Sequence, residues 1–229
     1  MHQHLLAETT VNVGGLWLAL VLVLVFAVLG VIGWRAKRRE IIAFRSWAAR
    51  YGYRYERRDD SVAGVSSAPP FELGRDSSCK CMDVFRGEYK NMHIVFFRYD
   101  YQSTAKDRPV MASYQVVAIG LPGPLPVLDV GREDFLSRWG KDVDFENQRF
   151  NDTFKIHSSD RRFASDVIHP RMMEWMLADR RAQTYRWRFD GPWLLSFRSG
   201  RVDLADVFAR ADFLIDVYAQ VPRHVWSNA

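Results

Sequence analysis

The most pronounced pattern in the sequence is an uninterrupted apolar run near its start. Residues 9–34 contain no charged side chain, and residues 11–34 are almost entirely hydrophobic. At about 1.5 Å per residue, a helix of this length spans roughly 36 Å, more than the ~30 Å hydrocarbon core of a bilayer. Trp17 and Trp34 lie toward its two ends, where indole rings favour the membrane interface. The pattern predicts a single transmembrane helix over residues 11–34.

The flanks of this run argue against a cleaved signal peptide. Residues 1–10 form a short tail without Lys or Arg, whereas a signal peptide begins with basic residues. Four bases follow the run in place of a small-residue cleavage site: Arg35, Lys37, Arg38 and Arg39. We therefore expect an uncleaved signal anchor in the plasma membrane. The positive-inside rule places residues 1–10 outside and the C-terminal part in the cytoplasm.

The basic segment after the run, residues 35–58, has an amphipathic helical pattern. Within it, residues 40–52 carry apolar side chains at a period of 3.6, and Gly52 is a candidate helix end. We expect Arg35, Lys37, Arg38 and Arg39 to lie at the membrane surface, because each base near an anionic leaflet contributes about 1 kcal/mol. The helix at 40–52 could lie on lipid or pack on the following domain, and the pattern fits both.

From residue 53 onward the hydrophobic pattern changes between strand and helix periods. Strands are predicted at 53–57, 79–88, 92–102, 110–121, 127–130, 150–157, 184–189 and 193–198. Helices are predicted at 161–168, 171–177 and 204–220, with one or two helical turns at 133–140. Hairpin-length connections favour antiparallel pairing. The predicted fold class is α+β: one N-terminal transmembrane helix, then a soluble domain, residues 59–229, of mostly antiparallel sheet and packed helices, with a possible subdomain from residue 146.

Three local predictions matter for the site. Residues 59–78 are rich in Ser, Gly, Pro and Asp and are predicted to be a loop or linker. Asp190 and Gly191 are predicted to form the turn of a hairpin between residues 184–189 and 193–198. Arg186 and Arg188 alternate with aromatic residues in that hairpin, so we expect them to face solvent.

Composition and charge narrow the classes of function. The chain has 229 residues, of which 48% are hydrophobic and 26% are charged, which is ordinary globular composition. Its formal charge of +5 is a local property, because the bases concentrate in residues 35–58 and the rest of the domain is close to neutral. A near-neutral domain is not suited to coating nucleic acid, so we expect no nucleic-acid partner.

Candidate chemistry in the sequence is sparse. Cys79 and Cys81 share one strand face but lack the further ligands of a metal site. His157, His169, Asp160 and Asp166 are the only plausible acid–base group. No nucleotide-binding glycine motif, nucleophile elbow or zinc-protease motif is present. We therefore predict no catalytic residue, cofactor or metal.

Several short segments occur in an order that resembles a known family. They are residues 47–55, 121–126, 150–164, 169–176 and 191–195. Together they are similar to actinobacterial single-pass membrane proteins of unknown function, related to a wider bacterial domain-of-unknown-function family. The resemblance implies membrane anchoring and a cytoplasmic or envelope-associated role. It carries over no catalytic residue.

Three hypotheses about function follow. The first is a membrane-anchored, non-enzymatic interaction or scaffold protein, whose partners are the lipid bilayer and another membrane or envelope protein. It predicts an exposed apolar patch of more than a few hundred Å². The second is a membrane-tethered sensor or binding domain for a lipid-like or small apolar ligand, which predicts a pocket of a few hundred Å³ with convergent polar groups. The third is an enzyme that uses the His and Asp residues named above.

Overall fold

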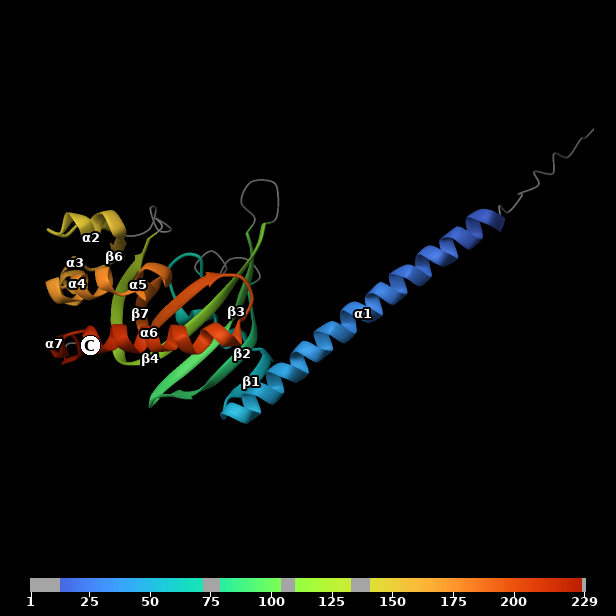
Figure 1. The fold of residues 1–229 in the computed structure, drawn as a ribbon, viewed down its shortest axis with the longest axis horizontal. Helices are drawn as coiled ribbons and strands as arrows, with labels where there is room; N and C mark the ends of the chain where they lie inside the picture. The colour runs from blue at the N-terminus through green and yellow to red at the C-terminus, as the bar shows by residue number, and fades with distance from the viewer. Residues whose placement is uncertain (1–12, 72–78, 104–109, 133–140, 228–229) are drawn as a thin grey trace, which may run out of the picture. The chain divides into compact units, whose positions relative to one another are not determined.

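The computed structural model describes residues 13–71, 79–103, 110–132 and 141–227. The chain divides into two compact units, Met1–Trp47 and Ala48–Ala229, and each is described by itself (Figure 1). The predicted helical turns at 133–140 lie outside the described residues.

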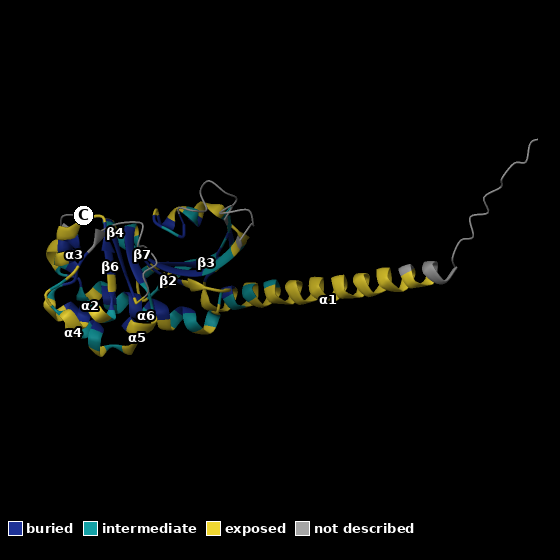
Figure 2. Cartoon of the chain, turned by 90° about the horizontal axis from the view of Figure 1, so that it is seen from above, coloured by how far each residue is buried: buried dark blue, intermediate teal, exposed yellow. Residues whose placement is uncertain are grey.

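A single long helix, α1 (Val13–Tyr51), contains both the apolar run and the amphipathic pattern that follows it. The stretch Leu20–Tyr51 is long and apolar enough to cross a membrane, and its most apolar window has a mean hydropathy of 2.1. None of that window is buried, and Figure 2 shows this part of α1 as exposed. The helix ends before Gly52, whose φ of +75° is the left-handed conformation common after a helix terminus. The structure thus supports the expected membrane anchor, whereas the orientation of the chain stays a prediction.

The domain is built on one seven-stranded sheet in which every pairing is antiparallel. The order is β1-β2-β3-β4-β6-β5, and β7 pairs with β4. The strands are β1 (Arg54–Arg58), β2 (Lys80–Tyr89), β3 (Met92–Ser103), β4 (Val110–Gly131), β5 (Lys141–Asp142), β6 (Lys155–Ser158) and β7 (Trp187–Ser199). The predicted hairpin between β2 and β3 is confirmed, and Lys90 and Asn91 form its turn with positive φ. The predicted α+β class is confirmed.

The predicted hairpin around Asp190 and Gly191 is wrong. Residues 187–199 form one strand, β7, which pairs along its whole length with the 22-residue strand β4. Gly191, with a φ of +56°, lies opposite Leu125 where the register shifts, so the Asp-Gly pair makes an irregularity inside a strand instead of a turn. The separate strands predicted at 110–121 and 127–130 are likewise one strand, β4.

The helices of the domain lie mainly at the end of the sheet away from β1, but the helix at residues 204–220 extends back to β2, where the rings of Phe208 and Tyr89 are 4.9 Å apart (Figure 1). They are α2 (Gln148–Thr153), α3 (Arg161–Val167), α4 (Pro170–Ala178), α5 (Arg180–Thr184), α6 (Leu204–Gln220) and α7 (Arg223–Ser227). Helix α6 has the predicted bounds, buries its apolar stripe, and is capped by the Asp203 side chain, which accepts from the Ala205 amide. The strand predicted at 150–157 is wrong in its first half, which is the end of α2.

The prediction of a loop or linker at residues 59–78 is wrong for residues 60–65 and is confirmed for residues 66–71, which form neither helix nor strand. Asp60–Val65 form a short 3₁₀ helix, η1, and the chain from Ser66 to Phe71 enters the core. Phe71 is fully buried against Tyr99 and Phe197, and the Tyr99 hydroxyl donates to the Phe71 carbonyl at 2.9 Å. A segment of turn-forming composition therefore packs as part of the domain.

Candidate functional site

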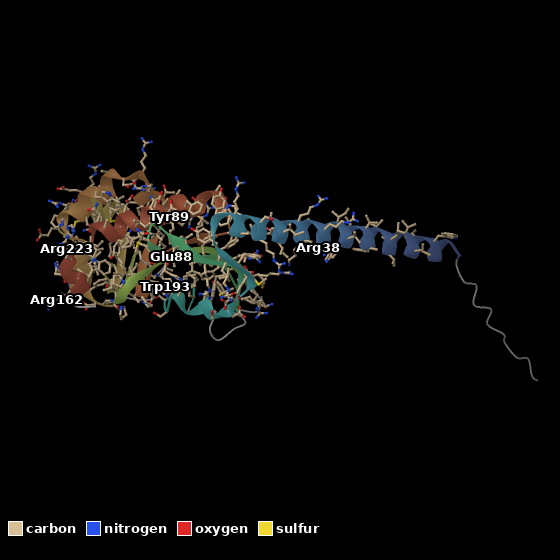
Figure 3. The ribbon with its side chains drawn as sticks, turned by 90° about the horizontal axis from the view of Figure 1, so that it is seen from below. Arg38, Glu88, Tyr89, Arg162, Trp193 and Arg223 are labelled. Carbon is tan, nitrogen blue, oxygen red and sulfur yellow. The ribbon has the colours of Figure 1, made fainter. Side chains whose placement is uncertain are left out.

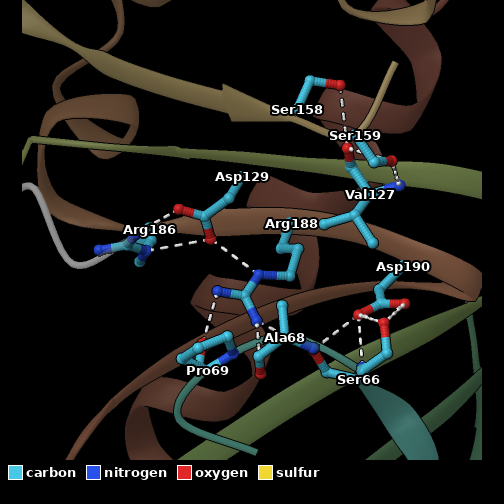
Figure 4. Close-up of polar contacts among 11 residues, drawn as sticks. Ser66, Ala68, Pro69, Val127, Asp129, Ser158, Ser159, Arg186, Arg188 and Asp190 are labelled. Carbon is cyan, nitrogen blue, oxygen red and sulfur yellow. Dashed lines mark hydrogen bonds and ion pairs between the residues drawn. The ribbon is translucent and has the colours of Figure 1, made fainter. Parts of the chain in front are cut away.

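The centre of the domain holds a buried ion cluster made of Asp129, Arg186 and Arg188 (Figure 4). Asp129 lies near the end of β4, and Arg188 is its cross-strand partner on β7. Arg188 Nε donates to Asp129 Oδ1 at 2.8 Å, and Arg186 Nε donates to the same oxygen at 3.1 Å. The Arg186 Nη2 group contacts the other carboxylate oxygen. Antiparallel pairing of two distant strands thus assembles the cluster.

Arg188 also fixes the segment that enters the core. Its Nη1 group donates to Ser66 Oγ at 2.9 Å, and its Nη2 group donates to the Pro69 carbonyl at 2.8 Å. Ser66 Oγ in turn donates to Asp190 at 2.8 Å, and the Ser67 amide donates to the same carboxylate (Figure 4). Every donor that Arg188 turns toward this segment therefore meets an acceptor, as a buried guanidinium requires.

The expectation that Arg186 and Arg188 face solvent is wrong. The Arg188 side chain is fully buried, and that of Arg186 is only 13% exposed. Burial opposes ionisation of Asp129, but the charges of Arg188 and Arg186 outweigh it, so the pKa of this carboxyl lies below its ordinary value. The cluster is therefore charged at neutral pH and holds the sheet to residues 66–70.

A second cluster surrounds Asp206 on α6. The Tyr185 hydroxyl donates to Asp206 at 2.9 Å, and Arg210, one turn further along the helix, also contacts this carboxylate. The Arg198 guanidinium lies 3.5 Å from the same carboxylate and 3.4 Å from Asp203. Burial opposes ionisation of Asp206, but Arg210 and the other donors outweigh it and keep its pKa below the ordinary value. This cluster fastens α6 to the segments before and at the end of β7.

Between these clusters lies a hollow of about 540 Å³, which we call the arginine hollow. It is bordered by the end of α5, the residues around both ends of β7, Tyr114 of β4, and Arg132, which follows β4. Its charged lining residues are Arg132, Arg186 and Arg198. No local motif marks Arg132 or Arg198 as parts of a site, because residues so far apart in the sequence leave no common spacing signal.

A further hollow of about 630 Å³ lies at the helical end of the domain. Residues of both charges line it, including Glu146, Arg161 and Glu174, and His169 lies at its wall. The mixture of charges indicates no particular ligand. Two hollows of several hundred Å³ nevertheless meet the volume expected of a ligand-binding domain.

Two of the four acid–base candidates cap helices. Asp160 caps α3 by accepting from the Arg162 and Phe163 amides. His169 caps α4 through its Nδ1 atom, which accepts from the Met172 amide, and its Nε2 atom lies 3.2 Å from the Gln220 carbonyl. Asp166 is 3.9 Å from His224, and His157 is buried on β6. Asp160 and His169 are therefore engaged as helix caps.

The two cysteines are free thiols. Cys81 is fully buried on β2, and burial raises the pKa of its thiol well above the ordinary value. Among the described residues there is no group of three or more His, Cys, Asp or Glu side chains placed to hold a metal ion.

Among its described residues, the domain surface lacks the apolar patch that the scaffold hypothesis predicts. In the described part of Ala48–Ala229, the large hydrophobic residues that are exposed are Tyr51 and Met111. Two isolated side chains are ordinary for a soluble surface. If the domain has a partner, polar and charged groups must provide most of the contact on the described surface.

In the other unit, the four bases expected at the membrane surface are all exposed on α1. Arg38 extends from the helix in Figure 3, with its guanidinium 5.0 Å from the centre of the Trp34 ring. An arginine beside an interfacial tryptophan suits the headgroup region. Contact of the four bases with lipid stays a prediction.

Comparison with known proteins gives one structural relative. The fold is similar to the crystal structure of the mycobacterial trehalose monomycolate transport factor A, TtfA, with a TM-score of 0.54. The two chains are 15% identical, and the match covers 78% of this chain and 94% of that chain. No protein-family model matches the sequence, and a search of curated proteins gives no significant match. The resemblance to an actinobacterial family therefore has only the weak support of a mycobacterial structural relative.

Proposed function

We propose that this protein is a membrane-anchored, non-enzymatic binding factor that acts in the handling of envelope lipids. The observation that carries the proposal is the combination of an unburied apolar helix with a domain whose fold resembles a lipid transport factor. The two hollows favour binding of a ligand, and the structural roles of the His and Asp candidates disfavour catalysis. Its partners are the bilayer and another membrane or envelope protein.

In this proposal the chain divides by role. Residues 1–10 form an external tail, residues 11–34 cross the plasma membrane, and residues 35–58 lie next to the cytoplasmic surface. There Arg35, Lys37, Arg38 and Arg39 contact anionic headgroups, which adds about 1 kcal/mol per base. Residues 59–229 form the cytoplasmic binding domain. The tether keeps the domain at a high effective concentration near other membrane components.

The binding role is tested with the full-length protein extracted from its native membranes in mild detergent. Lipids and proteins that remain bound are identified by mass spectrometry. The control carries residues 1–52 joined to an unrelated soluble domain, so that it retains the lipids that any membrane span holds. A lipid in stoichiometric amount, or an envelope-lipid transporter, found with the full chain and not with the control is the expected result. Identical lipid and protein profiles would contradict the proposal.

The orientation is tested separately with reporters fused to either end of the chain, one active only in the cytoplasm and one only outside it. We expect cytoplasmic activity at the C-terminus. Replacing Arg35, Lys37, Arg38 and Arg39 with Gln should produce a mixed orientation, because these bases provide most of the charge asymmetry across the helix. External activity of the C-terminal reporter in the unaltered chain would overturn the proposed topology.

A further inference from the structure

The arginine hollow lies where the two ends of the β4–β7 pair approach each other. In sheet register, Tyr114 of β4 is opposite Ser199 of β7, and Val130 is opposite Trp187 at the other end of the pair. Yet the guanidinium of Arg186 lies 5.5 Å from the ring centre of Phe197. The pair therefore curves so that its two ends meet across the hollow, which places arginines from separate segments around one space.

The charged residues described in this lining are all basic. Among the described residues, Arg132, Arg186 and Arg198 line the hollow, and no Asp or Glu does. The carboxylates that balance two of them belong to the clusters described above: Asp129 is fully buried, and Asp206 is 18% exposed. An anion that approaches Arg186 would therefore meet its guanidinium before the buried Asp129, whereas Arg198 also lies 3.4 Å from Asp203, which is 52% exposed.

Two of these arginines retain capacity for a ligand. The Arg198 side chain is 48% exposed, and its contacts with Asp203 and Asp206 are long, at 3.4 and 3.5 Å. Its Nε group is held by Gln115 at 3.1 Å, which orients the guanidinium. Arg132 is exposed at the rim. Guanidinium groups that are positioned and accessible are well suited to binding phosphate or carboxylate through paired hydrogen bonds.

The remaining wall is aromatic. Tyr114, Tyr185 and Phe197 contribute ring surfaces to the same hollow. Tyr185 is fixed by Asp206, and the Phe197 ring has Arg186 and Arg188 over it. Flat rings beside guanidinium groups accommodate a ligand that joins an anionic group to an apolar or ring-shaped portion.

We propose that the arginine hollow is a binding site for an anionic group, a phosphate or a carboxylate, held by Arg132 and Arg198. A lipid headgroup or a small soluble metabolite can present this chemistry. The proposal does not depend on the role in lipid handling, since it follows from the charge and shape of the hollow alone.

The test is isothermal titration calorimetry of the full-length protein in a neutral detergent. One arm titrates inorganic phosphate against a sodium chloride reference of equal ionic strength. The other arm titrates a phosphatidic acid with six-carbon chains, with the matching phosphatidylcholine as its neutral-headgroup reference. We expect saturable binding of at least one anionic probe. If phosphatidic acid binds clearly more tightly than inorganic phosphate, the anionic group belongs to a lipid headgroup. If the two probes bind with equal affinity, it belongs to a soluble anion.

Two double variants separate the hollow from general surface charge. R132Q/R198Q removes two bases of the hollow, and R162Q/R223Q removes two exposed bases on the outer surface of the helical end (Figure 3). We expect binding about tenfold weaker in the first variant, because charge-assisted hydrogen bonds are lost. The second should stay within about twofold of the unaltered chain.

The single variant Arg132→Gln tests the site without changing a residue of the sheet, because Arg132 follows the last residue of β4 and is exposed. It should weaken binding about threefold and leave the unfolding temperature unchanged. Equal losses in the two double variants, or no saturable binding of either anionic probe by the unaltered chain, would overturn the proposal.

Discussion

Two arginine-rich regions of this protein contain the same side chains in opposite surroundings. On α1, Arg35, Arg38 and Arg39 are exposed, and none of the ion pairs among the described residues includes them. At the start of β7, Arg186 and Arg188 share one buried carboxylate, Asp129. The first region is a group of exposed positive charges. In the second region, buried ion pairs fix the packing of segments that are distant in the sequence.

The difference between the two regions arises from pairing over long distances in the sequence. Asp129 and Arg188 are 59 residues apart, and Arg188 and Ser66 are 122 apart. Local sequence around β7 resembles an amphipathic strand with a solvated basic face, and only sheet register brings the carboxylate alongside. Whether an arginine is solvated or buried in an ion pair therefore depends on which residues the fold places opposite it.

The largest expected effect is on the buried cluster. Asp129→Asn leaves two guanidinium groups without their carboxylate, and one of them is fully buried. We expect a loss of about 3–5 kcal/mol in the free energy of unfolding of the domain. Urea denaturation of the full-length protein in detergent, followed by tryptophan fluorescence, measures it.

The matched control is Asp203→Asn, because Asp203 pairs with an exposed arginine and Asn also caps helices. Its cost should stay below about 1 kcal/mol. Similar stabilities for the two variants would remove the distinction between the buried and the exposed pairs.

Acid should weaken the same cluster. Asp129 has a folded-state pKa below its ordinary value, mainly because Arg188 and Arg186 overcome the effect of burial. Its stabilising contribution is complete above the unfolded-state pKa of about 4 and is lost as the pH falls through the lower folded-state pKa. The unfolding temperature of the unaltered chain should therefore fall below about pH 4, and its advantage over Asp129→Asn should narrow. A constant difference between the two down to about pH 2.5 would contradict this assignment.

A smaller effect is expected at the edge of the cluster. Ser66→Ala removes the hydroxyl that accepts from Arg188 and donates to Asp190. The loss should be about 1–2 kcal/mol, because a buried donor and a buried acceptor each lose a partner. Ser61→Ala, which removes an exposed hydroxyl that accepts from Arg86 at 2.8 Å, serves as the control for an exposed hydrogen bond in the same denaturation experiment. A cost no greater than that of the control would show that Arg188 does not depend on Ser66.

The smallest effect on the domain is expected from the other arginine region. Replacing Arg35, Lys37, Arg38 and Arg39 together with Gln should change its free energy of unfolding by less than about 0.5 kcal/mol, since all four side chains are exposed. The same denaturation curve measures it. A loss as large as that of Ser66→Ala would mean that these bases also stabilise the domain.

The sequence predicted the elements whose pattern is local. The apolar helix, the β2–β3 hairpin and α6 with its Asp203 cap all depend on periodicity and on neighbouring turn or cap residues. The sequence misled where tertiary contacts override a local preference. Asp190-Gly191 favours a turn, yet Gly191 continues β7 because β4 pairs on both sides of it.

The candidate site was less predictable than the fold. Arg132, Arg186 and Arg198 share a hollow only because the β4–β7 pair curves until its ends meet. Residues 66–71 belong to the core because Arg188 and Tyr99 supply partners for their polar groups. Neither relationship leaves a periodic or spacing signal in one sequence.

The contacts of Arg188 with residues 66–69 also set an order of events during synthesis. The ribosome makes Ser66 about 120 residues before Arg188, and at roughly 5–20 residues per second that interval lasts several seconds. Helix α1 is made earlier still and can enter the membrane during this time. We therefore expect the domain to complete its core after it is already tethered, because the contact between Ser66 and Arg188 cannot form until the chain as far as Arg188 has been made.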